Sequence, residues 1–220
     1  MPTLLDEIED ALEPCGLSLR GGFAPSEADG APKGVRALLM VGNAGPQMWQ
    51  AFAPHADQGP HALDRWIERA VGAIAARVGA KPLYPFAGPP YWPFQRWAGR
   101  AEPVHASPLG MLIHPEYGLW HAYRAALAFD RPIELPPRAD LLSPCDSCRD
   151  QPCLSACPVG AFSPAGYDVT ACHTHVQAAV GADCLNASCR ARRACPVGRA
   201  YGYEPAQARF HMTAFLSGRR

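Results

Sequence analysis

Apolar residues recur at the spacing of an amphipathic helix in two stretches of the chain. In residues 61–79 the apolar side chains follow i, i+3, i+4, i+7 spacing, and the charged ones lie off that stripe. In residues 3–13 the same spacing is shorter, and Thr3 and Asp6 have the residue types of a capping box. Gly79 follows the longer stretch, where a helix is expected to end. Both stretches are predicted to be helices that pack one face on a core.

Two further stretches do not have helical periodicity. Residues 35–41 are almost continuously apolar and are predicted to form a buried strand. The glycine-rich turn at residues 42–46 then leads into another apolar run. Strand, turn and helix in this order can hold an anion on backbone N–H groups, but an ordinary tight turn is the favoured interpretation. For residues 121–129 the periodicity does not distinguish a strand from a helix.

Residues 81–97 contain six aromatic side chains and five prolines. Prolines stiffen such a segment, and aromatic faces can line a flat pocket. The alternative is an irregular segment that fills its own core. If the segment lines a pocket, Tyr91 and Trp92 are candidate cofactor-binding residues.

Residues 131–144 contain four prolines and are predicted to be a linker. They divide the chain into a first domain, residues 1–138, and a second domain, residues 139–220. The tail after Gly202 is predicted to be a packed helix, anchored by Phe210, Met212 and Phe215.

Composition limits both the kind of partner and the cellular compartment that we expect for this protein. Only 18% of the 220 residues are charged, with 20 basic and 20 acidic side chains and a pI near 7.1, which argues against a nucleic-acid partner. No apolar run is long enough for a membrane helix, and the acidic N-terminus lacks the basic start of a secretory signal. We therefore expect a cytoplasmic, reducing location, where clustered cysteines indicate metal.

Eight of the nine cysteines form two runs with a lone cysteine between them. The first run starts at Cys145 with the pattern C-x2-C-x4-C-x3-C-P, and the second starts at Cys184 with C-x4-C-x5-C-P. Cys172 lies between the runs. The sequence Ala-Cys-Pro-Val-Gly occurs at residues 156–160 and again at residues 194–198. This internal repeat predicts a pseudo-twofold pair of loops.

Eight thiolates match the ligand requirement of two [4Fe–4S] clusters, because soft sulfur ligands hold iron–sulfur clusters. The last cysteine of a bacterial ferredoxin run ligates the other cluster, and the proline after it turns the chain away. The prediction is therefore a crosswise assignment of metal ligands. The first set is Cys145, Cys148, Cys153 and Cys195. The second set is Cys157, Cys172, Cys184 and Cys189.

Two other uses of the cysteines stay open at this point. Four disulfides would require an oxidising compartment, and two structural zinc sites would use the Cys-x2-Cys spacing but not the repeated Cys-Pro. His173 and His175 flank Cys172 and are alternative ligands. Since eight cysteines already satisfy two clusters, both histidines are predicted to lie beside the ligands or at the surface. Cys15 is predicted to be a packed or spare thiol.

The order of these eight cysteines resembles that of epoxyqueuosine reductases and the related corrinoid iron–sulfur proteins, which include reductive dehalogenases. Residues 112–120, Leu-Ile-His-Pro-Glu-Tyr-Gly-Leu-Trp, are similar to the family segment Leu-Ile-x-Pro-Glu-Tyr-Gly-Ser-Trp that precedes its cluster domain. The resemblance spans residues 108–200. It implies an α+β fold, with a nitroreductase-like α/β first domain followed by a ferredoxin-like second domain with two clusters. It also implies a corrinoid between the two domains.

The resemblance makes His114, Glu116 and Tyr117 candidate cofactor-binding residues and proton donors, with packing or turn formation as the alternative. Three cysteine loops are each two residues longer than in the family, and residues 101–107 contain no match to its catalytic aspartate. The 220 residues leave no space for the helical repeat domain that some members use on tRNA. We therefore expect no epoxyqueuosine reduction and assign no catalytic residue.

Three functions compete on this basis. The favoured one is an electron-transfer protein that docks a redox partner protein. The second is a reductase in which the clusters feed a small-molecule cofactor, cobalamin or a flavin, held by the first domain. The third is a scaffold with structural metal.

Overall fold

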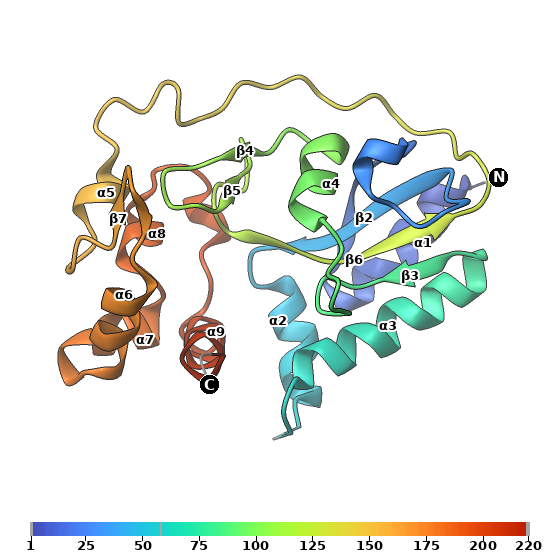
Figure 1. Cartoon of the computed structure of the whole chain (residues 1–220). Coiled ribbons are helices and arrows are strands. Elements are labelled where there is room, and N and C mark those ends of the chain that lie inside the picture. The colour runs from blue at the N-terminus through green and yellow to red at the C-terminus, as the bar shows by residue number, and fades with distance from the viewer. Residues whose placement is uncertain (1, 58, 219–220) are drawn as a thin grey trace. The chain divides into compact units, whose positions relative to one another are not determined.

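The computed structural model describes residues 2–57 and 59–218, which form two compact units (Figure 1). The first unit is Met1–Pro103 with Ala122–Asp140, and the second is Val104–His121 with Leu141–Arg220. The sequence analysis placed residues 104–121 in the first domain, whereas here they belong with the C-terminal residues. The mixture of helices and sheet agrees with the predicted α+β class.

The first unit contains a four-stranded sheet with strand order β1-β2-β6-β3. Strand β1 pairs antiparallel with β2, and β3 pairs antiparallel with β6. The strands are β1 (Ser18–Phe23), β2 (Ala37–Ala44), β3 (Lys81–Leu83) and β6 (His121–Phe129). The predicted strand at residues 35–41 is confirmed as β2, although it continues to Ala44, so that the turn is shorter than expected. A short helix, α2 (Gln47–Phe52), follows that turn.

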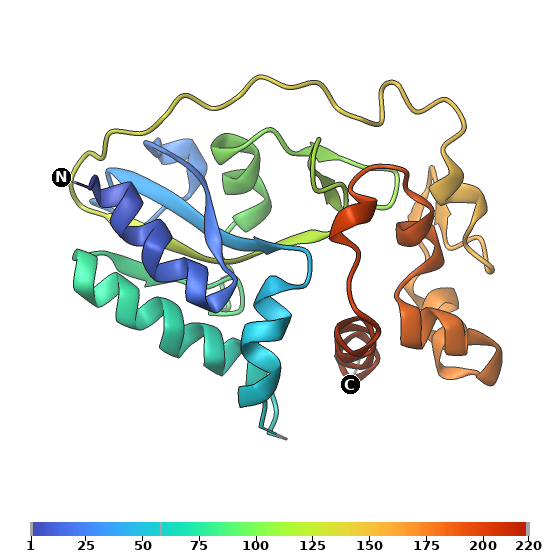
Figure 2. The ribbon, with the colours of Figure 1, turned by 180° about the vertical axis from the view of Figure 1, so that it is seen from behind.

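Helices α1 (Leu4–Leu12) and α3 (Ala62–Val78) cover one face of this sheet, as Figure 2 shows from behind. Both predicted helices are confirmed. At α1, the Thr3 hydroxyl accepts the Asp6 N–H, and the Asp6 carboxylate accepts the Thr3 N–H, which completes the expected capping box. Helix α3 ends at Gly79, whose φ of 67° is in the left-handed region that glycine adopts without strain.

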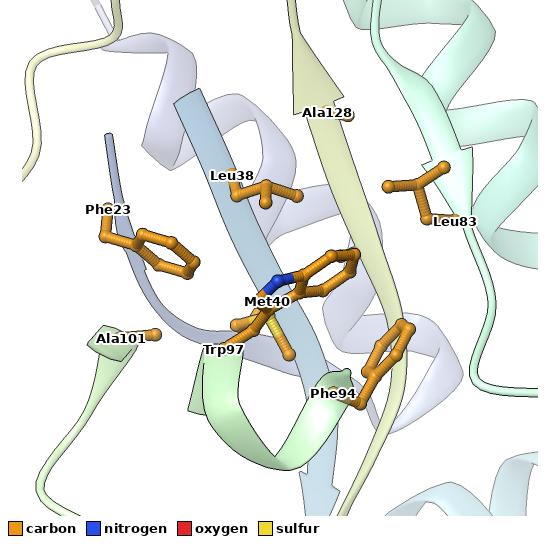
Figure 3. Packing of buried hydrophobic residues seen from close by; sticks show 9 residues of the cluster. Phe23, Leu38, Met40, Leu83, Phe94, Trp97, Ala101 and Ala128 are labelled. Carbon is orange, nitrogen blue, oxygen red and sulfur yellow. The ribbon is translucent and has the colours of Figure 1, made fainter. Parts of the chain in front are cut away.

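The opposite face is covered by α4 (Phe94–Ala101), which the sequence analysis did not predict. Figure 3 shows Trp97 lying across β2 between Met40 and Leu38. The Trp97 Nε1–H donates to the Asp29 carbonyl at 2.8 Å, and Trp92 stacks on the Trp97 ring at 5.9 Å. Much of the aromatic segment therefore packs within the core of its own unit.

Strands β2 and β6 are buried on both faces. Residues 37–43 and 125–129 are all buried, so β6 lacks the alternation by which a half-exposed strand is recognised. The ambiguity over residues 121–129 is thereby explained, and the segment is a strand. At Gly42 the two strands come close, because a Cβ there would lie 2.4 Å from the Ala122 carbonyl oxygen.

A buried ion pair joins β1 to the end of α4. Arg20, only 3% exposed, donates from Nε and Nη2 to the Glu102 carboxylate at 3.0 and 2.7 Å. The Tyr123 hydroxyl also donates to Glu102. Burial and the adjacent carboxylate raise the pKa of Tyr123, so this hydroxyl stays protonated.

The second unit is built from short elements. It contains two small antiparallel hairpins, β4 (His105–Ala106) with β5 (Leu112–Ile113), and β7 (Phe162–Ser163) with β8 (Gly166–Tyr167). Its helices are α5 (Pro152–Ser155), α6 (Val169–Gln177), α7 (Ala182–Ala187), α8 (Arg190–Ala194) and α9 (Pro205–Ser217).

The segments flanking these elements agree in part with expectation. The predicted linker has no helix or strand over residues 132–143. The predicted C-terminal helix is α9, but its most buried residues are Gln207 and Ala208, and the three expected anchors are half-buried.

In the part of the chain that the structure describes, no helix is both long and apolar enough to cross a membrane.

Candidate metal centre

The structure gathers the eight cysteines of the second unit into two groups, each with members from both runs. The Cys145 thiol is close enough to feel the charge of Cys148, Cys153 and Cys195. In the other group, Cys172 interacts with Cys157 and Cys184, and Cys189 interacts with Cys172 and Cys184. All nine cysteines fall within the described residues, and each has a free thiol, so none forms a disulfide.

Burial raises the pKa of four of these thiols, and neighbouring thiols raise it further. The four are Cys145, Cys153, Cys172 and Cys189. A metal that bound them as thiolates would have to displace their protons.

Four thiolates on one zinc ion lie about 3.8 Å apart, given a Zn–S bond of about 2.3 Å and tetrahedral geometry. Among the described residues, no three Cys, His, Asp or Glu side chains are close enough together to hold a single ion.

The second set surrounds a small hollow of about 20 Å³. All four of its cysteines line the hollow, together with His175. The remaining lining is largely apolar: Pro158, Val159, Phe162, Val176, Ala191 and Met212. These apolar side chains would exclude water from a group bound to the thiols, and they have no atoms that would replace a thiol as its ligand. His173 is occupied elsewhere, because its Nε2 lies 3.2 Å from the Leu216 carbonyl oxygen.

The first set lies beside the apolar core of the second unit. Cys195 is buried in that core, and Cys145 and Cys153 pack against it. The other buried members are Leu109, Ile113, Leu119 and Ala191. Segment 104–121 therefore helps to form the surroundings of the first set.

Backbone N–H groups point at sulfur in the second set. The Ala161 N–H donates to Cys157 Sγ at 3.3 Å. Cys189 is the N-cap of α8, and the N–H groups of Ala191 and Arg192 donate to its sulfur. These N–H groups favour negative charge on the Cys189 sulfur and partly offset the burial that raises its pKa.

The candidate residues His114, Glu116 and Tyr117 form a turn. His114 is buried, and its Nδ1 accepts the N–H groups of Glu116 at 3.1 Å and Tyr117 at 3.3 Å. Its ring stacks on that of Tyr117 at 4.3 Å. The Tyr201 hydroxyl donates to the Glu116 carboxylate, and this bond raises the pKa of Tyr201 to about 12. These contacts support turn formation for the three residues.

This turn packs tightly on the second copy of the Cys-Pro-Val-Gly repeat. A Cβ at Gly118 would lie 2.1 Å from the Val197 carbonyl oxygen, and one at Gly198 would lie 2.2 Å from the Tyr117 carbonyl oxygen. Both glycines have positive φ, 57° and 72°. The loop that follows Cys195 is thus positioned by residues 117–118, a long-range contact that spacing alone does not reveal.

Arg192 joins α8 to the same segment, and sequence analysis did not single it out. Its Nε and Nη2 donate to the Leu119 carbonyl at 3.0 and 2.6 Å. Its guanidinium lies 4.3 Å from the Trp120 ring centroid and 4.4 Å from that of Tyr203. Because Cys189 is the N-cap and Cys195 the C-cap of α8 (Arg190–Ala194), Arg192 fixes a helix that is flanked by one cysteine of each set.

We expect Arg192→Lys to destabilise the second unit by about 1–3 kcal/mol, because lysine cannot make the paired bonds or stack between two rings. Guanidinium denaturation followed by far-UV circular dichroism measures this. Arg199→Lys is the matched control, since Arg199 is exposed and lies outside this contact. Equal stability of the two variants would contradict the assigned role.

A second ionic contact braces the Cys184–Cys189 loop. The Asp183 carboxylate accepts from Arg190 Nε at 2.5 Å and from Arg193. These bonds lower the pKa of Asp183, so it stays ionised at neutral pH. The three side chains connect α7 to α8 next to two cysteines of the second set.

Tyr91 and Trp92 belong to the first unit. Tyr91 is 64% exposed, whereas Trp92 packs against the core beside Trp97. The two candidates therefore differ, since Tyr91 is accessible to a ligand and Trp92 is largely committed to packing.

No family model matches the sequence, and no curated protein matches it. Solved structures do match. An epoxyqueuosine reductase from Bacillus subtilis superposes with a TM-score of 0.54 and 13% identity, covering 94% of this chain and 69% of its own. The enzyme from Streptococcus thermophilus gives 0.54 and 14%, covering 90% of this chain and 67% of its own. The chain has the fold of these reductases.

A third match is an epoxyqueuosine reductase solved with a modified tRNA-Tyr stem loop, with a TM-score of 0.50, 14% identity and 94% coverage of this chain. At such low identity the likeness concerns the fold. It includes the cysteine-bearing second unit, because almost the whole chain is covered. The resemblance drawn from the cysteine order thus agrees with the fold.

Proposed function

We propose that this protein binds two [4Fe–4S] clusters and transfers electrons through them. The main support is that eight free thiols lie in two groups, and that each group contains cysteines from both runs. The first set would hold one cluster and the second set the other. Each cluster, when bound, stores and releases one electron at a time.

The residues around the thiols fit this role. The apolar lining of the second set and the core beside the first set exclude water. N–H donors on Cys157 and Cys189 stabilise negative charge on sulfur. The ion pairs of Asp183 and the stacking of Arg192 hold the ligand loops in place before a cluster binds. A redox partner protein is the expected source or recipient of the electrons.

Iron and acid-labile sulfide measured on anaerobically purified protein test the proposal. Two [4Fe–4S] clusters require about eight iron and eight sulfide per chain. Broad visible absorption that bleaches on reduction should accompany them. Two zinc ions per chain without sulfide would refute the proposal.

A second candidate function is supported by the extent of the fold likeness. The match covers the first unit as well as the second, and the matched proteins are reductases. In this candidate the first unit holds a corrinoid or a flavin, with Tyr91 and Trp92 as candidate contacts, and receives electrons from the second unit.

Titration with cob(II)alamin, and separately with flavin mononucleotide, distinguishes the two candidates. If the first unit holds a cofactor, one of them should bind with a Kd below about 10 μM, or about −7 kcal/mol. Tyr91→Ala should then weaken binding, and Tyr84→Ala serves as a control within the same segment. If neither cofactor binds at tens of micromolar, only the electron carrier survives.

A further inference from the structure

A hollow of about 380 Å³ lies beside the first set of thiols, whereas the hollow inside the second set is about 20 Å³. One of its lining residues comes from the turn at residues 114–118, and the others come from the loop that carries Cys145 and Cys148. The lining residues are Pro115, Leu142, Ser143, Pro144, Asp146 and Ser147. The wall of this hollow is therefore the same stretch of chain that supplies two thiols of the first set.

Hydrogen bonds within the loop hold this wall in shape. The Asp146 N–H donates to the Ser143 carbonyl at 3.1 Å, and the Cys145 N–H donates to the Ser143 hydroxyl oxygen at 3.3 Å. The Ser147 hydroxyl donates to the Pro144 carbonyl at 3.3 Å. Because these bonds already order the wall, a molecule that binds here loses little free energy in ordering it.

Two large apolar side chains at this hollow are exposed to solvent. Leu142, which lines it, is 85% exposed, more than any other large apolar side chain of the described residues, and the preceding Leu141 is 48% exposed. The Nε2 atom of His105 lies 2.9 Å from the Leu141 carbonyl oxygen, so the backbone here is attached to strand β4. Exposed apolar side chains next to a hollow are typical of a surface that binds another protein.

The charged side chains near this hollow are mostly acidic. Asp146 lines the hollow, Glu116 follows the lining residue Pro115, and Asp150 lies four residues beyond Asp146. Arg149 lies on the same loop, and all four charged side chains are exposed. Three carboxylates against one guanidinium favour a partner with positive charge.

The surroundings of the second set have the opposite balance. Arg190 lines its hollow, and Arg193 lies on the same short helix, α8. The Asp183 carboxylate accepts hydrogen bonds from both, so one negative charge faces two positive charges. A partner that is attracted to one set is therefore not attracted to the other.

We propose that the hollow at residues 142–147 is the docking site of a redox partner protein that presents an apolar side chain surrounded by lysine or arginine. The apolar side chain would enter the hollow against Leu142, and the cations would face Asp146 and Glu116. An apolar centre with a charged rim is the usual anatomy of a protein interface. A small molecule in the hollow would leave Leu141 and the outer carboxylates uncovered, so a protein surface fits better.

The inference rests on the proposed two-cluster function and makes the first cluster the point of exchange with the partner. One electron passes between them, and the first cluster changes between its 2+ and 1+ charge states while the partner gains or loses the same electron. The partner need not reach the buried thiols, because the loop that it contacts carries Cys145 and Cys148.

Stopped-flow oxidation of the whole, cluster-loaded chain tests this with two probes that share one haem. The chain is reduced with dithionite, freed of excess reductant and mixed with ferric mitochondrial cytochrome c, which has a basic face. The second probe is the same cytochrome after succinylation, which converts its lysines into carboxylates. In each reaction one electron passes from a reduced cluster to the ferric haem iron. At low ionic strength the basic probe should react about tenfold faster, and about 0.5 M salt should remove this advantage.

Asp146→Lys should lower the rate with the basic probe about tenfold and raise the rate with the succinylated probe. A changed cluster potential would move both rates in the same direction, so opposite changes are specific to docking. Asp10→Lys is the matched control, because it changes the net charge by the same amount at an exposed position of α1 in the first unit. It should change neither rate by more than about twofold.

Leu142→Ser should lower the rate with the basic probe several-fold at low and at high salt, with iron content unchanged, because this side chain makes few contacts within the chain. Val180→Ser is the matched control, since Val180 is 77% exposed and lies in the 3₁₀ helix η4 (Ala179–Gly181). This pair also decides the matter if Asp146→Lys loses a cluster.

An unchanged rate in Leu142→Ser, an equal loss in Val180→Ser, or a faster reaction of the unmodified chain with the succinylated probe would overturn the inference. A change in the same direction with both probes in Asp146→Lys would also overturn it. Absence of iron and sulfide from the unmodified chain would instead refute the two-cluster function.

Discussion

Cys195→Ser is expected to remove the first cluster and leave the second, and Cys157→Ser is expected to do the reverse. Each should lower iron content from about eight to about four per chain. The expectation is contrary to chain order. Cys157 ends a run whose other three cysteines belong to the first set, and Cys195 ends a run whose other two belong to the second set. The physical reason is that the Cys195 thiol lies beside Cys145 and Cys153, while Cys157 lies beside Cys172.

Electron paramagnetic resonance of the reduced variants, together with iron analysis, checks this result. Each variant should retain one signal, and the two retained signals should differ. Cys15→Ser is the matched control and should retain both clusters, since Cys15 lies in the first unit, outside both sets. If Cys195→Ser instead damaged the cluster that Cys184→Ser damages, the crosswise assignment would be wrong.

Gly198→Ala is expected to destabilise the second unit far more than Gly160→Ala. The two glycines occupy the same position in the two copies of the repeat, and both have positive φ, 72° and 57°. A Cβ at Gly160 meets nothing within 4 Å, whereas one at Gly198 would lie 2.2 Å from the Tyr117 carbonyl oxygen. Alanine should cost about 1–2 kcal/mol at Gly160 for backbone strain and about 3–5 kcal/mol at Gly198, where overpacking adds to it.

Chemical denaturation of both variants, followed by circular dichroism and by loss of visible absorption, measures the difference. We expect Gly198→Ala to lose the first cluster earlier in the denaturation than the second, because the strained loop carries Cys195. A similar midpoint for Gly160→Ala and Gly198→Ala would show that the contact with residues 117–118 does not stabilise the loop.

Sequence patterns predicted the elements whose formation depends on residues close together in the chain. Helices α1 and α3 followed from periodicity and terminal residues, and β2 from its apolar run. Strand β1 did not, because it contains Gly21, Gly22 and the charged Arg20, whose burial is compensated by partners farther along the chain, above all Glu102. Helix α4 was hidden by the aromatic and proline-rich residues before it.

In the candidate site, too, the features set by local sequence were predicted, and those set by contacts between distant residues were not. Cysteine spacing and the repeated Cys-Pro identified the eight thiols and their grouping as a hypothesis, because both depend on short stretches of chain. The support around the thiols did not follow from spacing. Arg192 stacks between Trp120 and Tyr203, and Gly118 packs on Gly198, through contacts between distant segments. Such contacts have no local signature.

The interleaved order of the two units has a consequence for how the protein is made. Segment 104–121 leaves the ribosome well before residues 191–198, on which it packs. Leu109, Ile113 and Leu119 therefore have no partner core while the intervening chain is synthesised. During that interval they are available to chaperones or to other nascent chains. The first set of thiols is completed later still by Cys195, so a metal group that needs all four thiols can bind there only after Cys195 has been translated.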